Sequence, residues 1–196
     1  MTRAVWDTLL TQVQALHRNA PDLAAFCDWP GDIKPQSVDP YHIPAAQLME
    51  TDAALDTSHP AATAFLAASP HAKWRETYKG TQITGDFMDR FGCYCLIGTG
   101  GAFTSAKISS YVVYMPPHLD YPAHHHPAEE MYLMLSGSAT FQCGQAAPET
   151  LQAGQSSQHA SNEPHATKTG ASPMLAYVVW RNNLGIPPIW TAKDLR

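Results

Sequence analysis

The sequence predicts a mainly β protein, an antiparallel barrel preceded by an α-helical segment, within its 196 residues. Two patterns predict this division. The first third places apolar residues at helical spacing between prolines, whereas from about residue 73 short apolar runs alternate with glycine, proline and serine. We therefore expect residues 1–72 to pack as helices on a barrel formed by residues 73–196, and the two parts to make one structural domain.

The helical segment is expected to contain three helices. Residues 4–18 form an amphipathic pattern, residues 45–55 a second helical region, and Pro60 suits the first turn of a helix over 61–68. The buried face of the first helix is predicted to carry Val5, Leu9, Val13 and Leu16. This segment holds no cluster of ionisable residues and too few basic residues for a DNA-reading helix. We expect it to cover the barrel or to contact a second subunit.

The strands of the barrel are predicted from five apolar runs. These are residues 93–97, 108–115, 131–135, 139–143 and 175–180. Ser136-Gly137 lies between two of them and suits a tight hairpin, and residues 98–101 suit a loop. Cys93 and Cys95 are expected to fill space on one side of a strand. Residues 186–196 are expected to pack back across the barrel.

Composition favours a small-molecule partner. The net charge is -5, and no run of lysine or arginine is present, so binding to nucleic acid or to an anionic membrane surface is not expected. No apolar stretch reaches the roughly 18–20 residues that a membrane span needs. The four cysteines lack zinc-finger spacing and are expected to be reduced thiols in a cytoplasmic protein. We expect a monomer or a homodimer.

The segment from residue 121 to 137 carries the pattern of a metal site. His124 and His126 lie two positions apart, so their side chains leave the same face of an extended segment, and Glu130 and Tyr132 form a second such pair. His125 points to the opposite face and is not expected to take part. Imidazoles with one carboxylate suit one divalent transition metal ion, and Zn, Fe, Mn, Ni and Co remain open.

These residues carry a resemblance to the cupins over roughly residues 90–185. Four residues fit the first cupin motif, G-x5-H-x-H-x3-E-x6-G: His124, His126, Glu130 and Gly137. The opening glycine is absent, since Pro117 or His118 stands there, and in the second motif Gly154 and His165 fit while Thr169 replaces the usual asparagine. The resemblance implies a double-stranded β-helix, a jelly-roll-like barrel, with His165 as a further ligand.

Tyrosines around the predicted ligands suggest the chemistry. Tyr132 should come near the metal, and a cation can lower a phenol pKa from about 10 towards neutrality, which would make Tyr132 a general base. Tyr121 is the second candidate. A phenolate beside a Lewis acid suits abstraction of a proton alpha to a carboxylate, followed by elimination. Tyr111, Tyr114 and Tyr177 are expected to be core residues.

The chain is similar to one family of cupin enzymes in particular. Six residues after a helical first third resemble those of the bacterial cupin-type dimethylsulfoniopropionate (DMSP) lyases of the DddQ kind: His124, His126, Glu130, Tyr132, His165 and Trp180. That family cleaves DMSP to dimethyl sulfide and acrylate.

The resemblance to these lyases also implies roles for single residues. His126, Glu130 and His165 would be core ligands, with His124 a further or exchangeable ligand and Tyr132 at the metal. Trp180 with Tyr121 and Tyr132 would bind the substrate, the indole facing the dimethylsulfonium. An Fe(II) dioxygenase and a non-catalytic cupin that binds a small ligand remain alternatives.

Overall fold

The computed structural model describes residues 2–79 and 85–191, and it confirms a mainly β fold preceded by helices. The helices are α1 (Thr2–Asn19), α2 (Pro21–Phe26), α3 (Pro44–Thr51), α4 (Pro60–Ala68), η1 (Ser69–His71) and α5 (Gly85–Arg90). The strands are β1 (Lys34–Pro35), β2 (Gly92–Ile97), β3 (Phe103–Thr104), β4 (Ile108–Met115), β5 (Asp120–His125), β6 (Glu129–Cys143), β7 (Glu149–Gln152), β8 (Ser156–His159), β9 (His165–Arg181) and β10 (Ile189–Trp190).

Prolines and capping side chains set the ends of the helices. Pro44 and Pro60 occupy the first turns of α3 and α4, where a missing N–H costs nothing. The ring of His59 accepts a hydrogen bond from the amide of Ala61 and caps α4. Helix α3 ends at Thr51, earlier than predicted, because the side chain of Asp52 accepts the amide of Ala54 and turns the chain.

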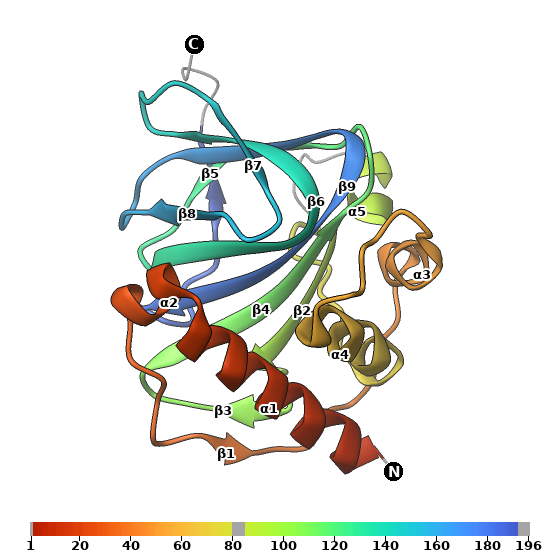
Figure 1. Ribbon diagram of the computed structural model, residues 1–196. Coiled ribbons are helices and arrows are strands. Elements are labelled where there is room, and N and C mark those ends of the chain that lie inside the picture. The colour runs from red at the N-terminus through yellow and green to blue at the C-terminus, as the bar shows by residue number, and fades with distance from the viewer. Residues whose placement is uncertain (1, 80–84, 192–196) are drawn as a thin grey trace.

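The strands form a sheet that curls on itself without closing, as expected of a cupin-like fold (Figure 1). Strand β9 is the central strand of this sheet, because it pairs antiparallel with β4, β5 and β6. Strand β6 also pairs with β7 and β8. The expected runs 93–97 and 108–115 are β2 and β4, and 175–180 is the second half of β9.

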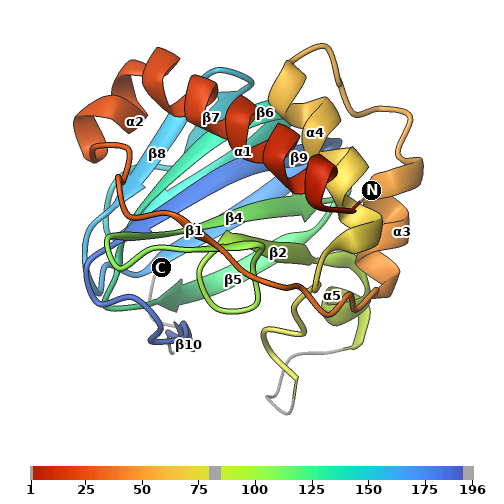
Figure 2. The same cartoon turned by 90° about the horizontal axis from the view of Figure 1, so that it is seen from below.

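Both faces of the sheet are buried, and they belong to different clusters. Leu133 and Tyr177 point outward and join Leu9 and Phe65 of α1 and α4 in one apolar core. Their neighbours in sequence, including Val178, point inward. Helices α1, α2, α3 and α4 therefore cover the outer face of the sheet, whereas Phe87 of α5 packs in the inner cluster (Figure 2). This packing supports a single domain, while the division at residues 72 and 73 stays a proposal.

The predicted hairpin at Ser136-Gly137 is wrong. Strand β6 runs through both residues, and its register against β9 shifts on either side of them, which marks a bulge. Gly137 has a φ of +73°, and a Cβ there would lie 1.7 Å from the carbonyl oxygen of Pro173. The glycine is required by close approach of two strands and not by a turn.

Other features refine the sequence-based description. His118 stands at the position of the missing cupin glycine and has a φ of +55°, so it takes the left-handed conformation itself. Helix α5 was not predicted. Strand β10 pairs with β5, and the rest of the expected C-terminal packing, residues 192–196, lies outside the described residues. No helix in the described part of the chain is long and apolar enough to cross a membrane.

Candidate metal centre

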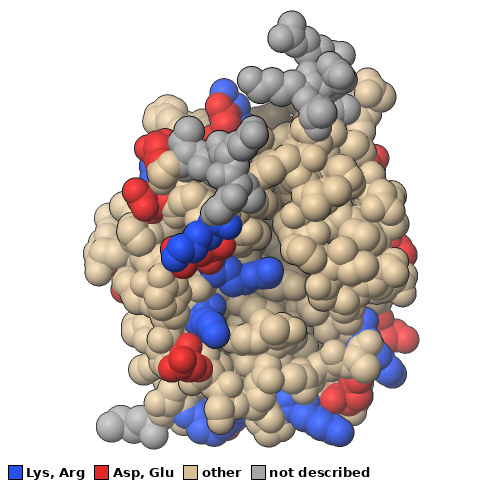
Figure 3. Space-filling model, turned by 180° about the vertical axis from the view of Figure 1, so that it is seen from behind, with Lys and Arg blue, Asp and Glu red and all other residues tan. Residues whose placement is uncertain are grey.

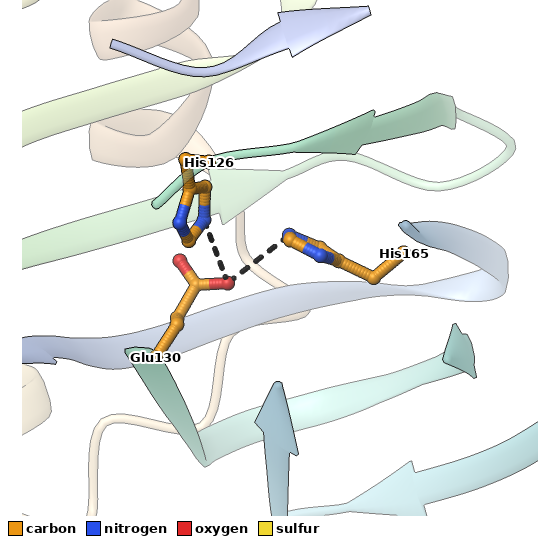
Figure 4. Close-up of side chains that lie close together, drawn as sticks. All are labelled: His126, Glu130 and His165. Carbon is orange, nitrogen blue, oxygen red and sulfur yellow. Dashed lines mark ion pairs between the residues drawn. The ribbon is translucent and has the colours of Figure 1, made fainter. Parts of the chain in front are cut away.

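Strand pairing brings the predicted ligands together inside the barrel. His124 of β5 lies opposite His165 of β9, and Glu130 of β6 lies between Trp180 and His159 on its neighbouring strands. His126 follows the end of β5. One ligand atom from each of His126, Glu130 and His165 lies within 4.8 Å of the other two, and all three side chains are buried (Figure 4).

The distances in this group suit a common ion. Oε2 of Glu130 lies 3.4 Å from Nε2 of His126 and 3.2 Å from Nε2 of His165. A tetrahedral ion with bonds of about 2.1 Å places its ligand atoms about 3.4 Å apart. The three side chains therefore hold the spacing that a divalent transition metal needs.

Hydrogen bonds also orient the imidazoles for a metal. Nδ1 of His124 and Nδ1 of His126 each lie 2.9 Å from a backbone carbonyl, and Nδ1 of His165 lies 2.8 Å from another. Donation from Nδ1 leaves Nε2 as the free lone pair. The buried Nε2 atoms of His126 and His165 have no hydrogen-bond partner in the described structure. A bound metal would satisfy both atoms, so the residues fit the ion that the sequence predicts.

Glu130 is an ionised carboxylate held from several sides. Burial alone would raise its pKa, but the close imidazoles of His126, His159 and His165 keep the pKa well below its usual value. Oε2 lies 2.7 Å from Nδ1 of His159, and Oε1 accepts a 2.6 Å hydrogen bond from the indole of Trp180. Burial lowers the pKa of His159. His159 is therefore a neutral donor that fixes one carboxylate oxygen.

His124 lies beside the three-residue group and not within it. Its ring is 4.2 Å from that of His165 and stacks on Tyr121 at 4.0 Å. Burial lowers the pKa of His124 well below its usual value, so the imidazole is neutral, the form that binds metals. This position agrees with a further or exchangeable ligand, which stays a prediction.

The two candidate bases have different surroundings. The hydroxyl of Tyr121 is hydrogen-bonded to that of Tyr78, and the ring packs against Phe91 at 4.5 Å. No side chain in residues 2–79 or 85–191 hydrogen-bonds the hydroxyl of Tyr132, which lines the same cavity as Glu130. Burial, and then the charge of Glu130, raise the pKa of Tyr132 well above its ordinary value.

The cavity at the ligands has a volume of about 40 Å³. A water molecule needs about 10–15 Å³ of such space, so there is room for an ion and a few waters. Tyr121, Tyr132 and Trp180, which were predicted to bind substrate, line this cavity, and their roles stay predictions; Tyr111, expected to be core, lines it too. The ring of Trp180 packs at 4.1 Å on that of His126.

Several other expectations are met. Tyr114 and Tyr177 pack in the outer core, and His125 turns away to the hydroxyl of Thr191. Cys93 and Cys95 are buried on the inner face of β2, and all four cysteines are free.

Two residues of the site were missed by sequence reasoning. His159 carries only the weak signal of the Ser157-x-His159 alternation in a short strand, and Arg75 carries none. Arg75 lines the cavity and His159 contacts Glu130, and both come to the site through strand pairing that no local pattern reveals.

Surface charge agrees with a small-molecule partner. In Figure 3 basic and acidic side chains are interspersed, and a hollow runs between them. The basic side chains on this face do not form a continuous positive surface of the kind that binds nucleic acid.

A family model and a known protein both match most of this chain. The model of the dimethylsulfoniopropionate lyase family matches residues 33–176. Dimethylsulfoniopropionate lyase DddQ of Ruegeria pomeroyi is 47% identical over 195 residues, which is 98% of this chain and 97% of that protein.

Solved structures agree with these sequence matches. The crystal structure of DddQ from Ruegeria pomeroyi superimposes with a TM-score of 0.94 at 46% identity, covering 97% of this chain and 98% of that one. A chain from the crystal structures of the DMSP lyases RdDddP and RnDddQII gives a TM-score of 0.92 at 33% identity, covering 98% and 100%.

Proposed function

Because the chain belongs to the dimethylsulfoniopropionate lyase family, we propose that it is a metal-dependent lyase that cleaves DMSP to dimethyl sulfide and acrylate. The observation that carries this proposal is the pairing of two kinds of group in one cavity. Nε2 of His126 and Nε2 of His165 have no hydrogen-bond partner among the described residues, and Glu130 is ionised. These groups lie beside the buried phenols of Tyr132 and Tyr121.

In the proposed reaction, the metal ligands and the base have separate roles. His126, Glu130 and His165 would hold a divalent ion, which supplies a Lewis acid for a carboxylate and a positive charge that lowers the pKa of a nearby phenol. Tyr132, as phenolate, takes the proton alpha to the substrate carboxylate. The electrons of that C–H bond form the C=C bond of acrylate, and the C–S bond breaks, so that dimethyl sulfide leaves with its electron pair.

The choice of Tyr132 as base rests on its hydroxyl, which no side chain in the described part of the chain hydrogen-bonds. Tyr121 is hydrogen-bonded to Tyr78 and stacked on His124, which suits a residue that positions its neighbours. Trp180 fixes Glu130 and lines the cavity, so it is placed to contact substrate as well. Its predicted contact with the dimethylsulfonium remains part of this proposal.

The decisive experiment is anaerobic incubation of purified, metal-loaded protein with DMSP while the headspace is assayed for dimethyl sulfide. We expect dimethyl sulfide and acrylate in equal amounts without oxygen. A requirement for oxygen would instead indicate a dioxygenase, and binding of DMSP without cleavage would indicate a ligand-binding cupin. Either result contradicts the lyase.

Metal removal gives the matched test of the site. We expect chelation to abolish dimethyl sulfide release, and His126→Ala, Glu130→Ala and His165→Ala each to lose both metal and activity while the protein stays folded. His124→Ala should retain more metal than these three, because three ligands remain. Full turnover by protein shown to be metal-free by elemental analysis would refute metal dependence.

The proposal also includes a cellular location and an oligomeric state. The four free cysteines support a cytoplasmic location, where thiols stay reduced. The expectation of a monomer or homodimer stands as a prediction for size-exclusion chromatography with light scattering.

A further inference from the structure

Arg75 places a positive charge in the wall of the metal cavity, and no carboxylate of the described residues pairs with it. Its side chain lines both this cavity and an adjoining outer pocket of about 550 Å³. Arg3, Arg90 and Arg181 each lie within 4.0 Å of an aspartate or glutamate. In residues 2–79 and 85–191, no carboxylate lies within that distance of the Arg75 guanidinium, which lies 5.0 Å from the centre of the Tyr111 ring.

The backbone holds Arg75 in this position. Trp74 bridges to Tyr94 of β2, and the amide of Arg75 donates a 2.8 Å hydrogen bond to the carbonyl of Cys93. Trp74 packs into the outer core beneath the helices. Because successive side chains of an extended segment point to opposite faces, Arg75 points into the barrel.

The groups around Arg75 do not neutralise it. Burial raises the pKa of the Cys93 thiol to about 11, that of Cys95 to about 12 and that of the Tyr111 phenol to about 12. All three groups are therefore uncharged near pH 7, whereas a guanidinium is always charged. A partly buried charge without a carboxylate partner among the described residues is costly, and a carboxylate ligand would complete the pair.

We propose that Arg75 forms a carboxylate-binding subsite, which receives the carboxylate of the zwitterionic substrate and of the acrylate product. This inference rests on the proposed function. The planar guanidinium presents two parallel N–H donors that match a carboxylate. It attracts the carboxylate end of DMSP and repels the sulfonium end, so one contact sets the direction in which the substrate lies.

The outer pocket gives this subsite a path to solvent. It shares Arg75, Tyr111 and Trp180 with the metal cavity, and the loop of residues 98–101 forms part of its rim. Ser109 and Gln36 add polar groups to its lining. Arg75 thus stands where the inner and outer spaces meet, and a carboxylic acid leaving the metal cavity by this route passes its guanidinium.

The test compares binding of propionate and propionamide by calorimetry to the full-length, metal-loaded protein. The two probes have the same shape and differ in charge, and neither alkylates cysteine. We expect the wild-type protein to prefer propionate by about 10- to 100-fold, the value of a charge-assisted hydrogen bond. Arg75→Met should weaken this preference, and Arg75→Lys should weaken it less. Lys73→Met, an exposed position on the same segment, should behave as wild type.

Controls separate this inference from the proposed function. Metal content is measured for every variant, and Arg75→Gln replaces Arg75→Met if the latter does not fold. An unchanged preference for propionate in folded, metal-loaded Arg75→Met would overturn the subsite and would leave the carboxylate to the metal alone. A wild-type protein that releases no dimethyl sulfide would refute the lyase, and the probe comparison would still decide the role of Arg75. With DMSP, we expect Arg75→Met to raise KM at least tenfold and to change kcat little.

Discussion

At the scale of single residues, Glu130 depends on donors from two other strands. His159 and Trp180 each bind one of its oxygens, at 2.7 and 2.6 Å. These hydrogen bonds hold the carboxylate in one orientation. Loss of such a partner of a metal ligand usually lowers the affinity for the metal. His159 is therefore a positioning residue, because it acts on the proposed ion through Glu130.

The first prediction follows from that role. We expect His159→Ala to lower metal affinity about 10- to 100-fold, because Glu130 loses the donor that fixes it. His125→Ala is the matched control, since that neighbouring histidine faces Thr191 and not the cavity. The measurement is competition for zinc against a chromophoric chelator. Equal zinc affinity in both variants would show that His159 only fills space.

The second prediction concerns the base. Tyr132→Phe keeps the ring and removes the hydroxyl, so we expect metal to be retained and kcat to fall about 10²- to 10⁴-fold, the usual loss for a positioned base. Tyr121→Phe is the companion variant and should lose less, because the hydroxyl of Tyr121 is already bound to Tyr78.

The outcome of this pair assigns the roles of both phenols. If Tyr121→Phe is inactive while Tyr132→Phe turns over normally, Tyr121 is the base. Normal turnover by both variants would exclude the phenolate mechanism. Single-turnover release of dimethyl sulfide is the measurement, since it reports chemistry and not product release.

At the scale of elements, spacing along one strand can be read from sequence, whereas pairing between strands cannot. The alternation of His124 with His126, and of Glu130 with Tyr132, follows from the period of an extended chain. Arg75 lines the cavity because Trp74 and Arg75 lie beside β2, and His159 contacts Glu130 because β8 pairs with β6. These contacts join residues far apart in sequence, so no local pattern marks them.

The bulge in β6 shows the same limit. Ser136-Gly137 has the composition of a hairpin turn, and a glycine with positive φ is needed in a turn and in a bulge alike. Only the neighbouring strand separates the two, since Pro173 of β9 occupies the space that a side chain at Gly137 would need.

The third prediction tests that reading of Gly137. We expect Gly137→Ala to cost more than about 3 kcal/mol of unfolding free energy, because the backbones of β6 and β9 must separate. Gly154→Ala is the control: Gly154 also has a positive φ, of +88°, but nothing lies within 4 Å of the added Cβ. It should cost only about 1–2 kcal/mol. Equal losses in urea unfolding would show that φ alone matters at Gly137.

At the scale of the whole molecule, the helices and the sheet share one apolar core, while the candidate metal site lies on the other face of the sheet. Phe65 of α4 stacks on Tyr177 of β9 at 6.2 Å, and the next residue of β9, Val178, lines the metal cavity. Arg181 joins the two parts further, because it pairs with Glu129 and lies 4.3 Å from the ring centre of Phe26. The helices therefore stabilise the sheet that positions the ligands, and they contribute no ligand themselves.

The last prediction separates this structural role from a catalytic one. Leu9 of α1 is fully buried, so we expect Leu9→Ala to cost about 2–5 kcal/mol through loss of burial and the cavity left behind. For a chain of this size that corresponds to a fall in Tm of roughly 4–20 °C. Thr8→Ala, at the exposed neighbouring position, should change stability by no more than about 0.5 kcal/mol. Well below the lowered Tm, kcat per metal-loaded molecule should match wild type, because Leu9 lies in the outer core and not at the cavity. A folded, metal-loaded Leu9→Ala protein with a large loss of kcat would show instead that α1 controls the geometry of the site.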